Sequence, residues 1–578
     1  MTEASGLGVK DWSFFLEPAF KSKELRGVRC LGFSKGLKYK YVQPQTKNSQ
    51  FFLSFLDQCT MELAGIPGPS LEITTSEYVP PSESDLFAHI AGFGESGSSG
   101  SQLSNRVYAA LREELTMIEH WDREITGWLD PRLLVDIKVP SQTSPGIRWK
   151  KLGYKTKKEA LMPATMEAAK VLLSMIETGT EYEVPPCGVA GRGKRMDMNR
   201  KVDTGGKKEG RLIVMPDLVR HLVGTLGSGA YMSKVKEVDK SQGGILLGMG
   251  PFSESYQSIA NWARGASKFV FLDFKKFDHR VPARVLQEVF KHIASRYEGC
   301  PGSKAYWRSE FQQLVNTKIA MPDGTVYQKK RGVASGDPWT SIAGSYANWM
   351  MLKHVCNVLG LVAKIWTFGD DSVIALYDVD PTLDLLPLFT KHLASSFGMH
   401  VSQEKSYVSD CLVDIAEDPE PKSSGSFLSL YFLQTPMGVR PTRPLQDMYE
   451  MMMVPERNQG TLRWEIVRTS MAYLTFYYND RARYVLEEYW DWLHRKYRVP
   501  ELKGNFTDLN LLREMDIPWS SFKLEWLVRL PRPGEVELMY KYGHTGFFPP
   551  LLWGHWYARY DRDVHGNNVS FAFQEPPT

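Results

Sequence analysis

The sequence predicts an α+β fold, with strands and helices alternating through the centre of the chain and helices dominating its last part. Short apolar runs alternate with amphipathic stretches of helical period between residues 268 and 398. Two of these runs, 362–368 and 372–377, are joined by a Gly-Asp-Asp turn, which is typical of a tight hairpin and hence of antiparallel strands. After about Pro441 the chain becomes rich in aromatic residues, methionine and basic residues, which predicts a mainly helical last domain.

The composition is that of a folded protein with more than one domain. The chain has 578 residues, of which 43% are hydrophobic and 24% charged, and it is too long for one ordinary domain. No uncharged apolar stretch reaches the length of about 18 residues that a membrane span requires, so none is expected. The six cysteines are scattered without a CxxC pair, which argues against a zinc ribbon or a disulfide framework.

The start of the chain is expected to be an extended arm that covers other parts of the protein. Four prolines between residues 67 and 81 make it rich in turns, and a low-complexity Gly/Ser stretch follows at 92–104. Beyond it, apolar periodicity predicts a helix over about 106–128 and another over 164–176, which begins after Pro163.

Positive charge is concentrated in one segment, although the net charge of the chain is only +4. Between Gly191 and Arg211, eight basic residues stand against three acidic ones, a local surplus of five. A patch of this kind can hold phosphates while the rest of the chain stays near neutral. A solvated, lysine-rich loop is the alternative interpretation.

Two aspartates, Asp273 and Asp278, stand at the end of an apolar strand predicted over 268–274. Residues of equal parity share a face of a strand, so both carboxylates can serve one site only if the strand ends after Phe274. Asp278 then lies in the turn before the next helix, whose apolar face is predicted to hold Val281, Val285, Leu286, Val289, Phe290 and Ile293. Taken alone, an aspartate at a strand end is more often a turn or cap residue.

The predicted hairpin turn contains Gly369 and two further carboxylates, Asp370 and Asp371. Adjacent carboxylates repel each other and are costly without a counter-ion. If the Asp273 strand lies beside the hairpin, three carboxylates converge, and such a set can hold two Mg²⁺ ions about 3.5–4 Å apart. An acidic surface turn is the alternative, but it does not explain why both flanking strands are apolar.

Two further helices are predicted in this region. Residues 340–359 contain no proline and a single interior glycine, Gly344, which predicts a long buried helix that stops at Gly360. The second helix, near 386–397, has a proline in its first turn and ends at Gly398.

Three motifs follow one another along the chain: DFKKFD from Asp273, SGDPWT from Ser335 and FGDDS from Phe368. In this order and spacing they resemble motifs A, B and C of viral RNA-dependent RNA polymerases. The resemblance continues through motif D in FGMHVSQEKS, motif E in FLSLYFLQTPMGVRPTRPL and motif F in GRGKRMDMNRKVDTGGKKEGRLIV, and it covers about residues 191–445. The phrases GRLIVMPDLVRHLVG and FLSLYF, with the SGxxxT helix, are similar to the polymerases of picobirnaviruses and partitiviruses, which are double-stranded RNA viruses.

The resemblance implies a right-hand polymerase fold with fingers, a thumb and an antiparallel palm sheet. The implied division is an N-terminal arm bridging fingers and thumb over 1–105, fingers with the basic NTP-channel motif over 106–267, palm with motif A over 268–281, a fingers insertion over 282–331, palm with motifs B to E over 332–440, and thumb with the C-terminal tail over 441–578.

The resemblance also implies roles for individual residues. Asp273, Asp370 and Asp371 would bind two Mg²⁺ or Mn²⁺ ions, and Lys405 would protonate pyrophosphate as a general acid. The nucleotide-binding residues would be Asp278 near the ribose, Ser335, Gly336, Thr340, Asn348, Arg211 and Lys208. Gly344 departs from the pattern, since many positive-strand polymerases have an asparagine there in contact with the ribose network. Ser345, Asn348 or water would have to supply that contact, or it is absent.

The implied activity is replication and transcription of a viral RNA genome by nucleotidyl transfer from NTPs to an RNA 3′-OH. The implied partners are template and product RNA, NTPs and, as a further candidate, a viral capsid protein. A monomer with no membrane association is expected, in the virion interior or the host cytoplasm. A reverse transcriptase-like polymerase and an inactive palm-fold RNA-binding scaffold remain alternatives, although Asp278 favours ribonucleotides and the intact carboxylates favour activity.

Overall fold

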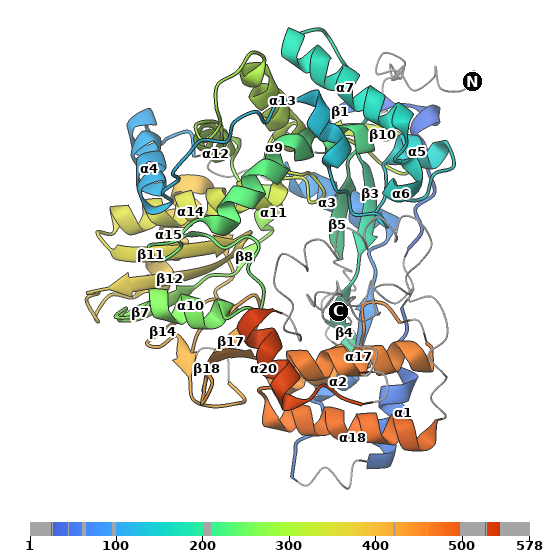
Figure 1. Ribbon diagram of the computed structural model, residues 1–578, viewed down its shortest axis with the longest axis vertical. Coiled ribbons are helices and arrows are strands. Elements are labelled where there is room, and N and C mark those ends of the chain that lie inside the picture. The colour runs from blue at the N-terminus through green and yellow to red at the C-terminus, as the bar shows by residue number, and fades with distance from the viewer. Residues whose placement is uncertain are drawn as a thin grey trace, which may run out of the picture.

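The fold is α+β with several small sheets, as the sequence predicts. The computed structural model describes residues 25, 27–43, 46–59, 65–94, 100–199, 210–419, 423–458, 460–497, 526 and 529–543. Figure 1 shows three groups of elements around the centre of the view: a five-stranded sheet with its helices on the left, a mixed group of strands and helices at the upper right, and a helical group at the bottom. Lys208 and the last residues of the chain lie outside the described residues.

The five-stranded sheet contains both strands of the predicted hairpin. Its order is β14 (Tyr407–Ser409), β7 (Lys268–Phe271), β12 (Asp371–Tyr377), β11 (Val362–Phe368) and β6 (Gly244–Ile245). The first four strands are antiparallel to one another where they pair, but β6 runs parallel to β11. The prediction of an antiparallel sheet is therefore wrong for this edge strand. The long segment 246–361 separates the two strands, so no hairpin dictates their relative direction.

Both faces of this sheet are buried, which explains its apolar strands. Val270 and Ile374 face a core that they share with the helices α12 (Ala283–Ala294), α14 (Thr340–Val358) and α15 (Leu385–Phe397). Their strand neighbours Phe269 and Val373 face a second core on the opposite side. The second core is covered by α10 (Ser255–Trp262) and by a small sheet that contains β15 (Val413–Asp414), β16 (Ser426–Phe427), β17 (Leu430–Thr435) and β18 (Gly438–Thr442). Strands covered on both faces read as continuous apolar runs.

The group at the upper right of Figure 1 contains two small sheets and several helices, and a third small sheet lies lower in the view. In the first sheet β10 (Thr325–Gln328) lies between β1 (Arg29–Phe33) and β9 (Lys318–Ala320). The other two sheets pair β2 (Ser76–Val79) with β4 (Lys194–Asp197), and β3 (Gly188–Arg192) with β5 (Arg211–Met215). The helices here and toward the sheet are α3 (Glu83–Gly92), α4 (Asn105–Ile118), α5 (Ile147–Lys151), α6 (Lys157–Ala160), α7 (Pro163–Thr178), α9 (Leu218–Glu237) and α13 (Ser303–Val315).

The helical group at the bottom of Figure 1 combines two helices from the early part of the chain with helices from its last part. It contains α1 (Gln50–Cys59), α2 (Leu71–Thr74), α16 (Leu445–Met453), α17 (Leu462–Thr475), α18 (Asp480–Lys496) and α20 (Pro533–Tyr542). Phe52 of α1 packs edge-on against Tyr489 of α18 with ring centroids 4.9 Å apart, and Ser49 donates a hydrogen bond to Glu465 at 3.1 Å. The mainly helical character of the last part is confirmed, while the division into domains stays a prediction.

Three of the predicted helices are confirmed, and a fourth is shorter than predicted. The helices predicted near 164–176, 340–359 and 386–397 are confirmed as α7, α14 and α15, and α15 ends at Gly398 with a φ of 67°. The helix predicted over 106–128 is wrong in its second half, because α4 ends at Ile118. The next residue, Glu119, is fully buried and accepts hydrogen bonds from the Ile245 N–H at 3.1 Å and the Tyr346 hydroxyl at 2.6 Å.

The strand predicted over 268–274 ends early, as a shared site for its two aspartates requires. β7 ends at Phe271, and the chain then forms β8 (Phe274–Lys275), which pairs with β13 (His400–Val401) in a separate ladder. Asp278 lies in the short helix α11 (Phe277–Arg280) that follows. Among the residues placed by the structure, no helix is both long and apolar enough to cross a membrane.

Candidate active site

Three aspartates gather at one end of the five-stranded sheet. Asp273 lies two residues beyond β7, Asp370 lies in the turn after β11, and Asp371 begins β12. Because β7 and β12 are antiparallel, with Val270 opposite Ile374, the last residue of β7 and the first residue of β12 lie at the same end of the sheet. The sheet register therefore brings together carboxylates that are far apart in the sequence.

The turn between the two hairpin strands has the geometry that its glycine permits. Phe368 pairs with Asp371, so Gly369 and Asp370 are the two turn residues. Gly369, the first of them, has a φ of 60°, which is the position that favours glycine in a two-residue hairpin turn. The turn places Asp370 at the tip of the hairpin, where its side chain stays exposed.

The pKa values of the cluster are raised mainly by desolvation and, for Asp370 and Asp371, also by neighbouring like charges. Burial, with a smaller contribution from the charges of Asp370 and Asp273, raises the pKa of Asp371 to about 7, although hydrogen bonds from two backbone N–H groups oppose the rise. Burial and the charge of Asp273 also raise the pKa of Asp370. Asp273 and Asp370 keep solvent-accessible surface, but the surrounding protein displaces enough water to destabilise their charged forms.

Asp371 differs from the other two aspartates because both of its carboxylate oxygens accept hydrogen bonds from backbone N–H groups. One oxygen accepts a hydrogen bond from the Ser372 N–H at 2.9 Å and the other from the Leu428 N–H at 2.6 Å. Leu428 and Ser429 form the turn between β16 and β17, with φ values of 52° and 62°. Asp371 therefore ties the hairpin to this second turn and has a fixed orientation.

The donor chemistry of the cluster fits divalent cations. Within the described ranges, no three His, Cys, Asp or Glu side chains lie close enough together to hold a metal ion as they stand. Asp273, Asp370 and Asp371 are nevertheless carboxylates with raised pKa values, and carboxylate oxygens are the ligands that Mg²⁺ prefers in proteins. A cation bound among them would offset the desolvation of all three carboxylates and the repulsion that adds to the raised pKa values of Asp370 and Asp371.

Two basic residues flank the carboxylates. Lys405 is exposed, and its charge lowers the pKa of Asp273 against the larger effect of burial. Arg211, the first residue of β5, lowers the pKa of both Asp278 and Asp370, which places its guanidinium near both. Positive charge from two distant parts of the chain thus faces the cluster.

Asp278 interacts electrostatically with both Asp370 and Arg211. Desolvation by the surrounding protein and, to a smaller extent, the charge of Asp370 together raise the pKa of Asp278 to about 6, although the residue keeps solvent-accessible surface. The backbone carbonyl of Asp278 accepts a hydrogen bond from the Val333 N–H at 2.8 Å. The structure therefore joins the short helix α11 to the loop that leads to Ser335.

The loop that contains Ser335 and Gly336 is docked on β5. The Ser335 hydroxyl accepts a hydrogen bond from the Val214 N–H at 3.0 Å and donates one to the Leu212 carbonyl at 3.3 Å. A Cβ atom at Gly336 would lie 2.0 Å from the Val214 carbonyl oxygen, so only glycine fits. Thr340 closes the loop by donating its hydroxyl to the Ala334 carbonyl.

Asn348 lies beneath the hairpin turn. This buried side chain donates a hydrogen bond to the Gly369 carbonyl at 3.1 Å, and the Ser345 hydroxyl accepts one from the Gly369 N–H at 2.8 Å. The observed contact of Asn348 is thus with the turn that carries Asp370, and its assignment to the nucleotide stays a prediction. A Cβ at Gly344 would meet only Phe277, at 3.7 Å, so this position faces α11 with room to spare.

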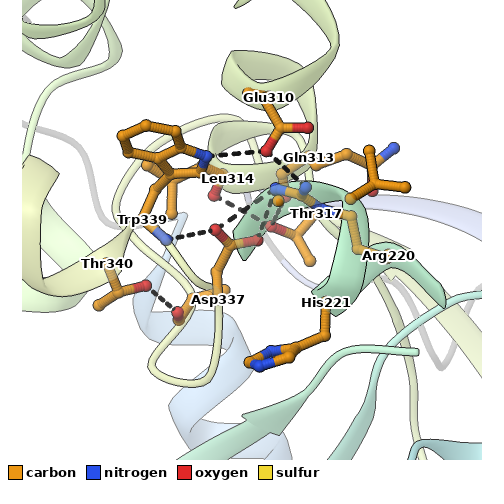
Figure 2. Close-up of polar contacts among 12 residues, drawn as sticks. Arg220, His221, Glu310, Gln313, Leu314, Thr317, Asp337, Trp339 and Thr340 are labelled. Carbon is orange, nitrogen blue, oxygen red and sulfur yellow. Dashed lines mark hydrogen bonds and ion pairs between the residues drawn. The ribbon is translucent and has the colours of Figure 1, made fainter. Parts of the chain in front are cut away.

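Two further sets of residues were missed by the sequence analysis. Figure 2 shows the first, a buried network of Arg220, Glu310, Asp337 and Trp339. Its signal in the sequence is an arginine within the apolar stretch LIVMPDLVRHLVG, where a charge requires a buried partner.

The second missed set lines a pocket of about 500 Å³ beside β3. Its polar lining consists mainly of the lysines Lys38, Lys40, Lys150 and Lys151 and the tyrosines Tyr39 and Tyr41. Lysines interleaved with aromatic residues, as in KGLKYKYV and RWKKLGYK, are the signal that could have found it.

Comparison with known proteins agrees with this geometry. A family model described as viral RNA-dependent RNA polymerase matches residues 134–485, more than half of the chain. The chain is similar to the genome polyprotein of Tobacco vein mottling virus, with 23% identity over 163 residues, which are 27% of this chain and 5% of the polyprotein. It is also similar to the genome polyprotein of Blackberry virus Y, with 26% identity over 135 residues, or 22% of this chain and 4% of the polyprotein. Neither comparison supports the picobirnavirus and partitivirus lineage specifically.

Proposed function

The chain belongs to the viral RNA-dependent RNA polymerase family, and from this we propose that it copies an RNA template by transferring nucleotides from NTPs to an RNA 3′-OH. The observation that carries the proposal is the convergence of Asp273, Asp370 and Asp371 at one end of a sheet, with Arg211 close enough to Asp370 to act on its charge. Nucleotidyl transfer needs carboxylates for cations and a positive group for the triphosphate, and this end supplies both.

The proposed architecture is a right hand. The five-stranded sheet would be the palm, the sheets and helices around β3 and β5 the fingers, and the helical group of α16 to α20 the thumb. The contacts of α1 with α18 and the pairing of β1 with β10 support an N-terminal arm that bridges fingers and thumb. The short strand β6 and helix α10 would belong to the palm, although they precede the predicted palm segments.

The proposed chemistry follows from the charges at the site. Two Mg²⁺ or Mn²⁺ ions held by Asp273 and Asp370, with Asp371 in support, would stabilise charge on the attacking and departing oxygens. Arg211 would bind the triphosphate, because its planar guanidinium matches phosphate oxygens. Lys405, beside Asp273, would donate a proton to the pyrophosphate as it leaves.

Selection of the sugar and binding of RNA would use neighbouring groups. Asp278 would lie near the ribose and distinguish the 2′-OH. The pocket of lysines and tyrosines beside β3 would bind RNA, with ammonium groups on the phosphates and rings stacked on bases. We further propose a monomer that acts in the virion interior or the host cytoplasm, a viral capsid protein as partner, and a lineage near the picobirnaviruses and partitiviruses, on the strength of the motifs quoted above.

The function is tested by incorporation of labelled NTP or dNTP on a short RNA template with Mg²⁺. Template-dependent incorporation of NTP, with dNTP strongly disfavoured, is the expected result. Preferential incorporation of dNTP would move the protein to reverse transcription. Binding of RNA without any incorporation would favour the scaffold alternative.

Replacing Arg211 by alanine is expected to raise the KM for NTP about tenfold, because a charge-assisted contact with the triphosphate contributes on the order of 1.5–3 kcal/mol. Arg211→Lys should raise the KM less than Arg211→Ala, since lysine keeps the positive charge but lacks the planar guanidinium. The matched control is Arg192→Ala, its cross-strand partner in β3, whose guanidinium is held by Glu456 at 2.6 Å. An unchanged KM in Arg211→Ala, measured by steady-state incorporation, would remove Arg211 from the triphosphate site.

A further inference from the structure

A buried ion network lies beneath the loop that contains Ser335 and Gly336. Figure 2 shows the Arg220 guanidinium between two carboxylates, 2.5 Å from a Glu310 oxygen and 3.1 Å from an Asp337 oxygen. Trp339 completes the network, with its indole N–H donating to Glu310 at 2.8 Å and its backbone N–H to Asp337 at 3.0 Å. The side chains of the three charged residues are at most 4% exposed.

The network joins three separate elements of the fold. Arg220 comes from α9, Glu310 from α13 and Asp337 from the loop before α14. If the loop left, Arg220 would keep only Glu310 as a buried partner and Asp337 would lose its buried cation, so the departure has a cost. The ion pair with Arg220 therefore holds one end of the loop against the rigid helix α9.

A second buried basic residue, Lys329, holds the other end of the loop through hydrogen bonds to backbone carbonyls. Lys329 is buried, and its ammonium donates to the carbonyl of Gly332 at 2.9 Å and to the carbonyls of Leu314 and Val315 at the end of α13, at 2.5 Å and 3.0 Å. Residues 333–336 therefore lie between two points at which buried basic residues, Lys329 and Arg220, hold the loop. Only this short stretch is left to meet β5.

From Asp337 a short chain of contacts leads to the triphosphate side of the site. Gly336 packs on the Val214 carbonyl so closely that a Cβ would lie 2.0 Å away. The Ser335 hydroxyl bridges the Val214 N–H and the Leu212 carbonyl. Leu212 is adjacent to Arg211, whose charge acts on Asp278 and Asp370. The position of the loop and the position of the first residue of β5 are therefore linked.

We propose that Asp337, through its buried ion pair with Arg220, is a positioning residue that presses residues 335–336 onto β5 and so sets where Arg211 meets the incoming nucleotide. The inference deepens the proposed polymerase function and rests on it for its kinetic consequence. Asp337 would not contact the substrate. It acts through the loop and through the backbone of β5.

The test compares two variants that each remove one carboxylate from Arg220. Asp337→Asn is expected to raise the KM for NTP about tenfold with kcat changed less than about threefold, because nucleotide binding rather than the chemical step depends on the loop. Glu310→Gln makes the same change of charge on the α13 side and should leave the KM within about twofold of wild type. Both variants should lower the Tm to a similar extent, because each disturbs the same buried network.

Hydrogen exchange supplies a readout that needs no activity. The Val214 N–H is bound to the Ser335 hydroxyl, so its exchange reports whether the loop is docked. Peptides covering 211–216 should exchange faster in Asp337→Asn and at the wild-type rate in Glu310→Gln. Equal exchange and equal KM in the two variants would overturn the proposal and leave Asp337 a stabilising residue only.

The outcomes also separate this inference from the proposed function. An Arg211→Ala variant with a raised KM beside an Asp337→Asn variant with a normal one would refute the inference alone. A wild-type protein that incorporates no nucleotide would refute the function, and the exchange of 211–216 would then decide the positional claim. If Asp337→Asn does not fold, Arg220→Lys replaces it, because lysine keeps the charge but lacks the planar guanidinium that contacts both Glu310 and Asp337. A raised KM and faster exchange of 211–216 in Arg220→Lys would then support the positioning role, and wild-type values would overturn it.

Discussion

Replacing Asp370 by asparagine is expected to reduce nucleotide incorporation at least about a thousandfold, since loss of one cation ligand removes several kcal/mol of charge stabilisation in the transition state and each 1.36 kcal/mol is a factor of ten. The fold should survive the change. Burial and the charge of Asp273 raise the pKa of Asp370, so its ionised form is a cost to the folded state at pH values above that raised pKa. At pH 7.5, without divalent cations, the Tm of Asp370→Asn should therefore equal or exceed that of wild type.

The control for this variant lies at the other end of the same strand. Asp378 follows β12 and has a φ of 53°, a conformation that asparagine accepts as readily as aspartate. Asp378→Asn should leave incorporation unchanged. Addition of Mg²⁺ or Mn²⁺ should raise the Tm of wild type and of Asp378→Asn but not that of Asp370→Asn. Retained incorporation in Asp370→Asn, or an equal rise in Tm with cation, would remove Asp370 from the metal site.

Replacing Gly336 by alanine is expected to lower kcat/KM about a hundredfold, a loss on the order of 2.7 kcal/mol, because the new methyl group must displace the loop from β5. The Cβ would lie 2.0 Å from the Val214 carbonyl oxygen. That oxygen belongs to the backbone of β5, which pairs with β3 and cannot move alone. The effect would be read by steady-state incorporation together with the Tm.

Gly344 offers the matched control for the alanine substitution. It lies inside α14, where its nearest neighbour to a Cβ is Phe277 at 3.7 Å, an ordinary contact distance. Gly344→Ala should preserve incorporation and stabilise the helix by roughly 0.5–1 kcal/mol, because glycine is a poor helix former. Normal activity in Gly336→Ala would show that the loop is not required in its docked position.

Much of the fold could be predicted because the signals are local. The helices α14 and α15 and the hairpin of β11 and β12 follow from apolar periodicity and from glycines that stop or turn the chain. Gly360, Gly369 and Gly398 all have positive φ values, as their positions between elements require. Such choices depend on residues within a turn or two of each other.

Where the prediction failed, a distant partner was responsible. The helix predicted to Trp128 ends at Ile118 because the carboxylate of Glu119 is bound by groups 126 and 227 positions away in the sequence. The direction of β6 was missed because its pairing with β11 crosses a long connection. The ion pair of Arg220 with Asp337 spans 117 positions, and no local pattern marks it.

The sequence by itself determined the order of the elements, the residue types of the site and, through the motifs from Asp273 to Asp371, the family of the protein. Only the tertiary structure decided how those residues are used. It shows Asp371 held by two backbone N–H groups, Asn348 bound to the hairpin turn and Ser335 bound to β5. The physical reason is that helix and turn preferences are properties of neighbouring residues. The cost of burying a charge or a polar group depends instead on which partners the whole fold brings within hydrogen-bond distance.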